Sequence, residues 1–69
     1  MKKEMIDALM HDAEAQSFIA RMNIQVLLNN PAGVGDHPNI MQTIQEQLDV
    51  VSKHKDRLSV LAEHFYDEE

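Results

Sequence analysis

The sequence predicts an all-α protein, an antiparallel hairpin of two long helices that forms a single domain over residues 1–69. Both glycines and both prolines lie within residues 29–39, and this stretch divides the chain into two nearly equal halves. In each half apolar residues recur every three to four positions, the spacing that places them on one face of a helix. With two phenylalanines, one tyrosine and no tryptophan, the core must be built from aliphatic side chains.

The first helix is predicted over about residues 2–28, and its apolar surface is wide. One stripe along it comprises Ile6, Leu9, Ala13, Ala20, Ile24 and Leu27. A second, adjacent stripe comprises Ala15, Phe18, Ile19, Met22 and Val26. A single partner helix cannot cover both stripes, and soluble monomers seldom expose a contiguous apolar patch. We therefore expect three residues of the second stripe to form an interface with another chain: Phe18, Met22 and Val26.

A loop is predicted between the helices, over about residues 29–37. Pro31 cannot donate a backbone hydrogen bond and disfavours the helical conformation of the residue before it, so the first helix must end here. Gly33 and Gly35 readily adopt the positive φ angles that a chain reversal needs. Asp36 is a favourable N-cap for the second helix, because its carboxylate accepts hydrogen bonds from free backbone N–H groups. The residues that mark this loop are Asn30, Pro31, Gly33, Gly35, Asp36, His37 and Pro38.

The second helix is predicted over about residues 38–66, where the helical spacing of apolar residues continues. Its apolar residues are Ile40, Ile44, Leu48, Val51, Leu58, Leu61 and Phe65. Two helices of similar length joined by a short loop are expected to pack antiparallel. Counting outward from the loop gives the expected pairs between the helices: Leu27 with Ile40, Met22 with Ile44, Ile19 with Leu48, and Ile6 with Val60 or Leu61.

A run of polar residues, 52–57, interrupts the apolar pattern of the second helix. We expect it to lie opposite residues 11–15, where a kink, a hydrated layer or a functional site would fit. Four of its members carry a positive charge or acquire one on protonation: Lys53, His54, Lys55 and Arg57. This cluster is a candidate anion-binding site, and the competing interpretation is a solvated helical face.

The composition narrows the classes of function. A formal net charge of −6 argues against sequence-independent binding of nucleic acid and disfavours anionic membranes. No apolar run approaches the roughly 20 residues that span a bilayer, and the early acidic residues do not fit a signal peptide. The absence of cysteine removes disulfides and thiolate chemistry and fits an intracellular protein. We expect a cytoplasmic protein without a membrane partner.

No arrangement typical of a metal, cofactor or catalytic site is present in the sequence. The four histidines lack the Glu-x-x-His and His-x-x-x-His spacings of helical metal sites, although His11 and His54 can approach each other between antiparallel helices. The glycines of the loop precede a helix N-terminus, which can bind anions, but Asp36 would repel an anion there. No serine falls into a recognisable arrangement with a histidine and an acid. We therefore expect no metal, no cofactor and no enzymatic activity.

The loop carries a resemblance to a known family. The segment Asn-Pro-Ala-Gly-Val-Gly-Asp-His-Pro-Asn-Ile (residues 30–40), followed by Lys-Asp-Arg-Leu-Ser-Val-Leu (residues 55–61), resembles a family of small helical proteins of T-even-like tailed phages, marine cyanophages among them. The resemblance covers about residues 26–65. It implies a virus-encoded protein made in a bacterial cytoplasm, and it brings no activity or catalytic residues.

Two functions remain open on these observations. The first is a non-enzymatic protein–protein interaction module, in which two hairpins dimerise into a four-helix bundle and act on a host or phage protein. The wide apolar surface of the first helix favours it. The alternative is an oligomeric binder of a nucleotide or other anion, through the Gly33–Pro38 loop and the Lys53–Arg57 cluster.

Overall fold

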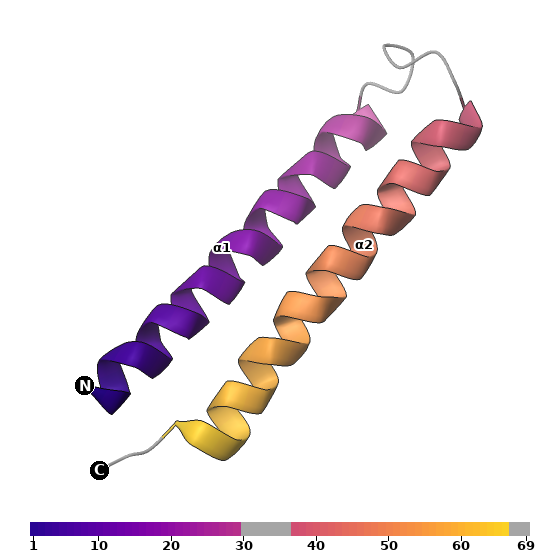
Figure 1. Cartoon of the computed structure of the whole chain (residues 1–69). Helices are drawn as coiled ribbons and strands as arrows, with labels where there is room; N and C mark the ends of the chain where they lie inside the picture. Colours follow the sequence, from indigo (N-terminus) through magenta and orange to yellow (C-terminus); the bar gives the residue numbers. More distant parts are fainter. Residues whose placement is uncertain (30–36, 67–69) are drawn as a thin grey trace.

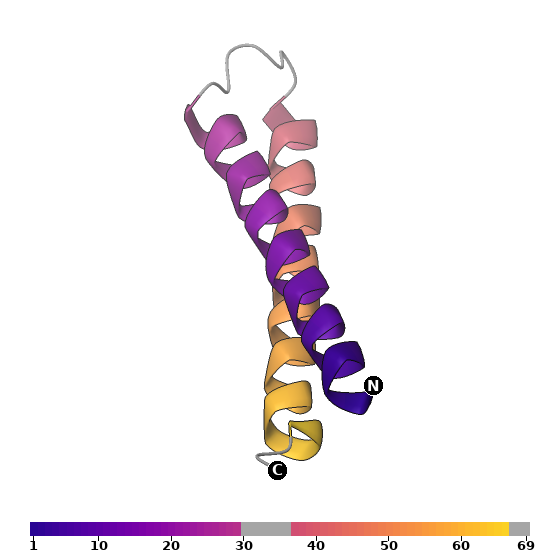
Figure 2. The same cartoon turned by 90° about the vertical axis from the view of Figure 1, so that its left-hand side faces the viewer.

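The computed structural model describes residues 1–29 and 37–66 and shows two long helices. Helix α1 (Lys2–Asn29) and helix α2 (His37–Val60) lie side by side and run antiparallel, and a short π-helix, η2 (Leu61–Phe65), continues α2 (Figure 1). The start of α1 and the end of η2 lie at the same end of the molecule in both views (Figure 2). The predicted all-α hairpin is therefore confirmed, with no strand in the two described ranges.

The helices pack through one repeating pattern, which we call the interhelical seam. On α1 the buried and half-buried residues of the seam alternate between spacings of four and three: Ile6, Met10, Ala13, Ser17, Ala20, Ile24 and Leu27. On α2 and η2 they follow the same alternation: Ile40, Ile44, Gln47, Val51, His54, Leu58 and Leu61. Such an alternation is the heptad pattern of coiled coils, in which two helices meet along a narrow line of side chains.

The middle of the seam is made of small residues on the α1 side. Ala13, Ser17 and Ala20 are almost completely buried, and their short side chains let the two helix backbones come close together. Small side chains also remove little apolar area from water, and that area sets the hydrophobic stabilisation. Within the described ranges the buried apolar core comprises only Ile6, Ala13, Ala20 and Ile40. The hairpin therefore has a thin core.

Two of the pairs expected between the helices are wrong. Ile19, Met22 and Leu48 are about half exposed, at 53%, 45% and 50%, and do not belong to the seam. Counting from the loop gave the positions of these residues along the helix axes. It did not give the directions in which they point, because residues two positions apart point about 200° apart around the axis. Met22 lies two positions from both Ala20 and Ile24, so it points away from α2. Leu9, assigned to the first stripe, is also exposed.

The polar run of residues 52–57 does not kink the helix, since α2 is regular up to Val60. The irregular turn comes later, where η2 replaces the last turn of the predicted helix. There the Tyr66 N–H donates to the Leu61 carbonyl at 2.8 Å, five residues back. Tyr66 itself is extended, with ψ of 117°, and ends the helix.

Most of the predicted loop lies outside the described residues. This applies to Asn30, Pro31, Gly33 and Gly35, and to the expected N-cap Asp36. Helix α2 begins at His37 and places Pro38 in its first turn, where a proline costs no helical hydrogen bond. Across the described ranges, no helix is both long and apolar enough to cross a bilayer.

Candidate interaction surface

Helix α1 carries a second heptad-like row on the face turned away from α2, which we call the outer stripe. Its residues again alternate between spacings of three and four, and every one of them is exposed: Met5, Ala8, Asp12, Ala15, Ile19, Met22 and Val26. Asp12 is the one charged residue among the seven. A row of this spacing is the pattern with which a helix packs against another helix, so α1 is equipped for contacts on two faces.

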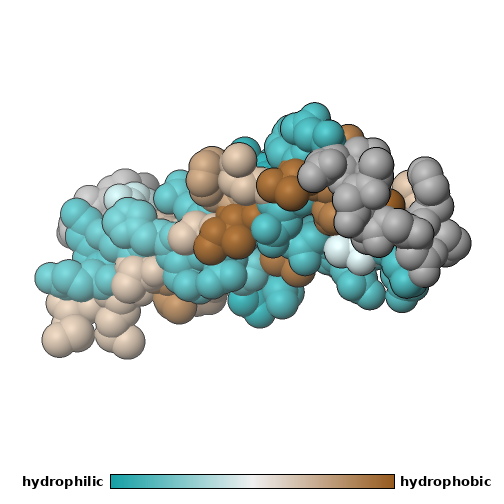
Figure 3. Space-filling model, turned by 90° about the horizontal axis from the view of Figure 1, so that it is seen from above, coloured by the Kyte–Doolittle hydropathy of each residue, from teal (hydrophilic) through white to brown (hydrophobic). Residues whose placement is uncertain are grey.

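The outer stripe is most apolar in its second half. Ile19, Met22 and Val26 are 53%, 45% and 63% exposed, and Phe18 beside them is 55% exposed. The predicted interface residues Phe18, Met22 and Val26 therefore lie together on the surface of the hairpin. Figure 3 shows one face of the molecule, on which apolar side chains gather near its middle between polar ones.

Phe18 also has a polar neighbour on its own helix. The Arg21 guanidinium carbon lies 5.5 Å from the centre of the Phe18 ring, within the range of a cation–π contact. Both residues line a shallow groove of about 430 Å³ at the edge of the seam, together with Glu14, Ser17, Lys55 and Leu58. Phe18 thus lies at the border between the outer stripe and this groove.

The outward face of α2 carries more polar residues than that of α1. Its exposed polar residues are Gln42, Gln45, Glu46, Asp49, Ser52, Lys53, Asp56 and Ser59. Three large apolar residues of α2 are also exposed, at 61%, 50% and 41%: Met41, Leu48 and Val60. One of the few side-chain hydrogen bonds there is local, from the Gln42 amide to the Glu46 carboxylate at 3.5 Å. Among the described residues, more of the exposed large apolar side chains lie on α1 than on α2.

The candidate anion-binding residues do not converge on one place. Lys53, Lys55 and Arg57 are exposed, but successive members are two residues apart and so point in different directions around α2. Lys55 lines the groove beside Phe18, whereas Arg57 lines a second groove on the other edge of the seam. His54 is only 6% exposed, and its Nδ1 has no hydrogen-bond partner among the described residues. The structure therefore separates these four residues.

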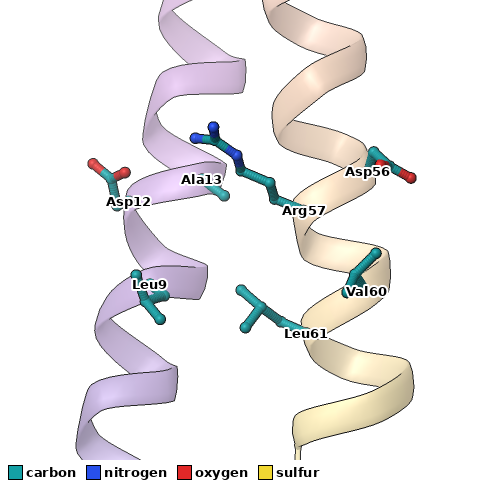
Figure 4. A pocket seen from close by; sticks show the side chains of 7 residues that line it. All are labelled: Leu9, Asp12, Ala13, Asp56, Arg57, Val60 and Leu61. Atoms are coloured by element: carbon teal, nitrogen blue, oxygen red, sulfur yellow. The ribbon is translucent and has the colours of Figure 1, made fainter.

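The second groove has a volume of about 330 Å³ and an apolar floor. Figure 4 shows Arg57 and Leu61 reaching from the α2 side toward α1, whereas Asp12 and Asp56 point away from its centre. Leu9, Ala13 and Val60 complete the lining. The lining therefore combines one guanidinium and two carboxylates with apolar walls.

The histidines and acidic side chains are the residues that could bind a metal ion. No group of three or more histidine, cysteine or acidic side chains in residues 1–29 and 37–66 is placed to hold a metal ion. His11 is exposed, and His64 lies 3.7 Å from the Glu63 carboxylate on the same turn. Ser17, the most buried serine described, belongs to the seam.

Sequence reasoning missed two features of this surface. The burial of His54 follows from the four–three alternation, which reaches it from Ile40 through Gln47, but its polar neighbours in the sequence suggested a solvated face. The outer stripe also extends beyond the predicted interface, back to Met5.

Comparison with known proteins does not assign the chain to a family. No family model, no curated protein and no solved structure matches it. Its resemblance to small proteins of T-even-like phages stays a prediction based on the loop residues.

Proposed function

We propose that the protein is a non-catalytic interaction module that binds other protein through the outer stripe of α1, and that its partner is a second copy of itself. The observation that carries this proposal is the exposure of four large apolar side chains in adjacent turns of one helix: Phe18, Ile19, Met22 and Val26. Contiguous apolar surface of this kind marks protein-binding sites on soluble domains.

The total surface of the chain supports the same proposal. The chain exposes 5387 Å², whereas a compact monomer of 7.9 kDa is expected to expose about 4,400 Å². Its radius of gyration is 15.6 Å, against about 11 Å for a compact domain of this length. The excess of roughly 1,000 Å² is comparable to the roughly 800 Å² that each partner buries in a stable complex. Two hairpins together form an assembly of four helices.

The mass of the protein in solution tests this proposal. We expect light scattering at micromolar concentration to give a dimer or a higher closed oligomer, and Met22→Glu to reduce it to the monomer, because a carboxylate would be buried against apolar side chains. Gln45→Glu is the matched control, since it adds the same charge on the polar outward face of α2 and should leave the mass unchanged. A wild-type mass equal to the 7.9 kDa monomer contradicts the proposal.

A further inference from the structure

We infer that two copies pair through their outer stripes in one antiparallel register, with a two-fold axis between Ile19 and Met22. The α1 helices then lie at the centre of the dimer and the α2 helices on the outside. This inference rests on the proposed function and adds to it the geometry of the partner.

The central position of α1 follows from its two apolar rows. A helix that is apolar on opposite faces is normally buried between neighbours, whereas a helix with one apolar face lies at a boundary with water. Helix α1 has the seam on one face and the outer stripe on another, whereas on α2 the exposed apolar residues Met41, Leu48 and Val60 are scattered among polar ones. Placing α1 against the partner's α1 covers the apolar second half of the outer stripe and leaves the mainly polar outward face of α2 in water.

Asp12 excludes a parallel arrangement of the two α1 helices. In a parallel pair related by two-fold symmetry, each residue of the outer stripe lies beside its own copy, so Asp12 would face the partner's Asp12. Like charges in contact at an interface from which water is excluded are strongly unfavourable. In an antiparallel pair each residue meets a different one, and Asp12 can be matched with a polar group.

The positions of the polar residues also select one antiparallel register. With the axis between Ile19 and Met22, the large residues meet across it, Ile19 against the partner's Met22. Ala15 then lies against the partner's Val26, so that a small side chain meets a larger one. Asp12 meets the partner's Asn29, the last residue of α1, which is exposed and whose amide can donate a hydrogen bond to a carboxylate.

Moving the axis by half a heptad gives a poorer match. With the axis between Ala15 and Ile19, each Asp12 carboxylate lies against the partner's Met22, and a charge buried against a thioether has no hydrogen-bond donor. The preferred register overlaps residues 12–29, a contact about 27 Å long at 1.5 Å per residue.

Cross-linking of cysteines that are introduced one at a time can report this register, because the natural chain has no cysteine. In the preferred register the two copies of residue 22 are offset by about 4.5 Å along the helix axis, and the two copies of residue 15 by about 16 Å. We therefore expect a short bis-maleimide to link Met22→Cys into a covalent dimer, while Ala15→Cys stays unlinked. Gln45→Cys, on the outward face of α2, measures linking by random collision. Light scattering of each variant confirms that it has the mass of the wild type.

The other outcomes overturn the inference in distinguishable ways. If the Ala15→Cys variant is linked into a dimer and the Met22→Cys variant is not, the alternative antiparallel register is present. If the Ala8→Cys, Ala15→Cys and Met22→Cys variants are each linked, the two α1 helices are parallel. A dimeric mass with no linked variant places the interface on another face. A monomeric wild type contradicts the proposed function itself and not merely this register.

Discussion

Helices α1 and α2 meet through the same four–three alternation but differ on the faces turned away from each other. The outward face of α2 is mainly polar, with Met41, Leu48 and Val60 exposed among its polar residues, whereas the outer stripe of α1 has one charged residue, Asp12, among seven. The inward faces therefore specify the hairpin, and the outward faces specify how many neighbours each helix has. In the proposed dimer α2 has one helical neighbour and α1 has two.

The largest expected effect on stability comes from a pair of substitutions that place the same charged residue on each of the two faces of α1. Ala20 is 2% exposed in the seam and Ala15 is exposed in the outer stripe, so Ala20→Asp and Ala15→Asp introduce the same group at two kinds of site. We expect Ala20→Asp to destabilise the hairpin by about 3 kcal/mol or more, since a buried, unpaired carboxylate is left without compensation. Circular dichroism during thermal unfolding measures this loss.

Ala15→Asp should act on association instead. In the proposed dimer it places one carboxylate against Val26 at each of the two symmetric contacts, so the mass measured by light scattering should fall while the helical signal remains. Equal loss of helicity in both variants would show that the outer stripe is part of the fold itself and would remove the distinction between the faces.

A smaller effect is expected at His54, the most polar residue of the seam. Its Nδ1 has no partner among the described residues, and an unsatisfied buried polar atom costs about 1–3 kcal/mol. Replacing it by the leucine that a heptad position favours should therefore raise the free energy of unfolding by about that amount. The exposed His64→Leu is the control and should change it by less than about 0.5 kcal/mol. A destabilised His54→Leu would indicate that the imidazole has a partner that the hairpin alone lacks.

The smallest effect concerns the start of α1. The Met1 ammonium lies 2.7 Å from the Glu4 carboxylate; their hydrogen bond, followed by one to the backbone, lowers the pKa of Glu4 below its ordinary value of 4.5. The folded chain therefore holds this proton less tightly than the unfolded chain, so the stabilisation is complete above pH 4.5 and is lost as the pH falls through the lowered pKa. Both groups are exposed, so Glu4→Gln should lower the melting temperature only slightly at pH 7 and not at all at pH 2.

The hairpin was predictable because its signals are local. Glycine and proline are confined to one stretch, and the spacing of apolar residues on either side of it fits a helix and no other secondary structure. The residues of the seam were harder to predict, because a helix places each residue by angle as well as by height. Met22 and Leu48 lie at suitable positions along the helix axes but point away from the seam. Ser17 and His54 point into the seam, but their polar side chains did not indicate burial. The wide apolar surface of α1 was predictable, and the separation of Lys55 from Arg57 into different grooves required the structure.

In the proposed dimer, the thin seam makes the stability of the folded state depend on how much protein is present. Its small central residues, Ala13, Ser17 and Ala20, bury little surface, so a large part of the favourable free energy of the proposed dimer comes from association rather than from the single chain. Association therefore adds to the stability of the folded hairpin, and each tenfold dilution removes about 1.4 kcal/mol of this added stability. The abundance of the chain in its cell would then determine the fraction of it that is folded.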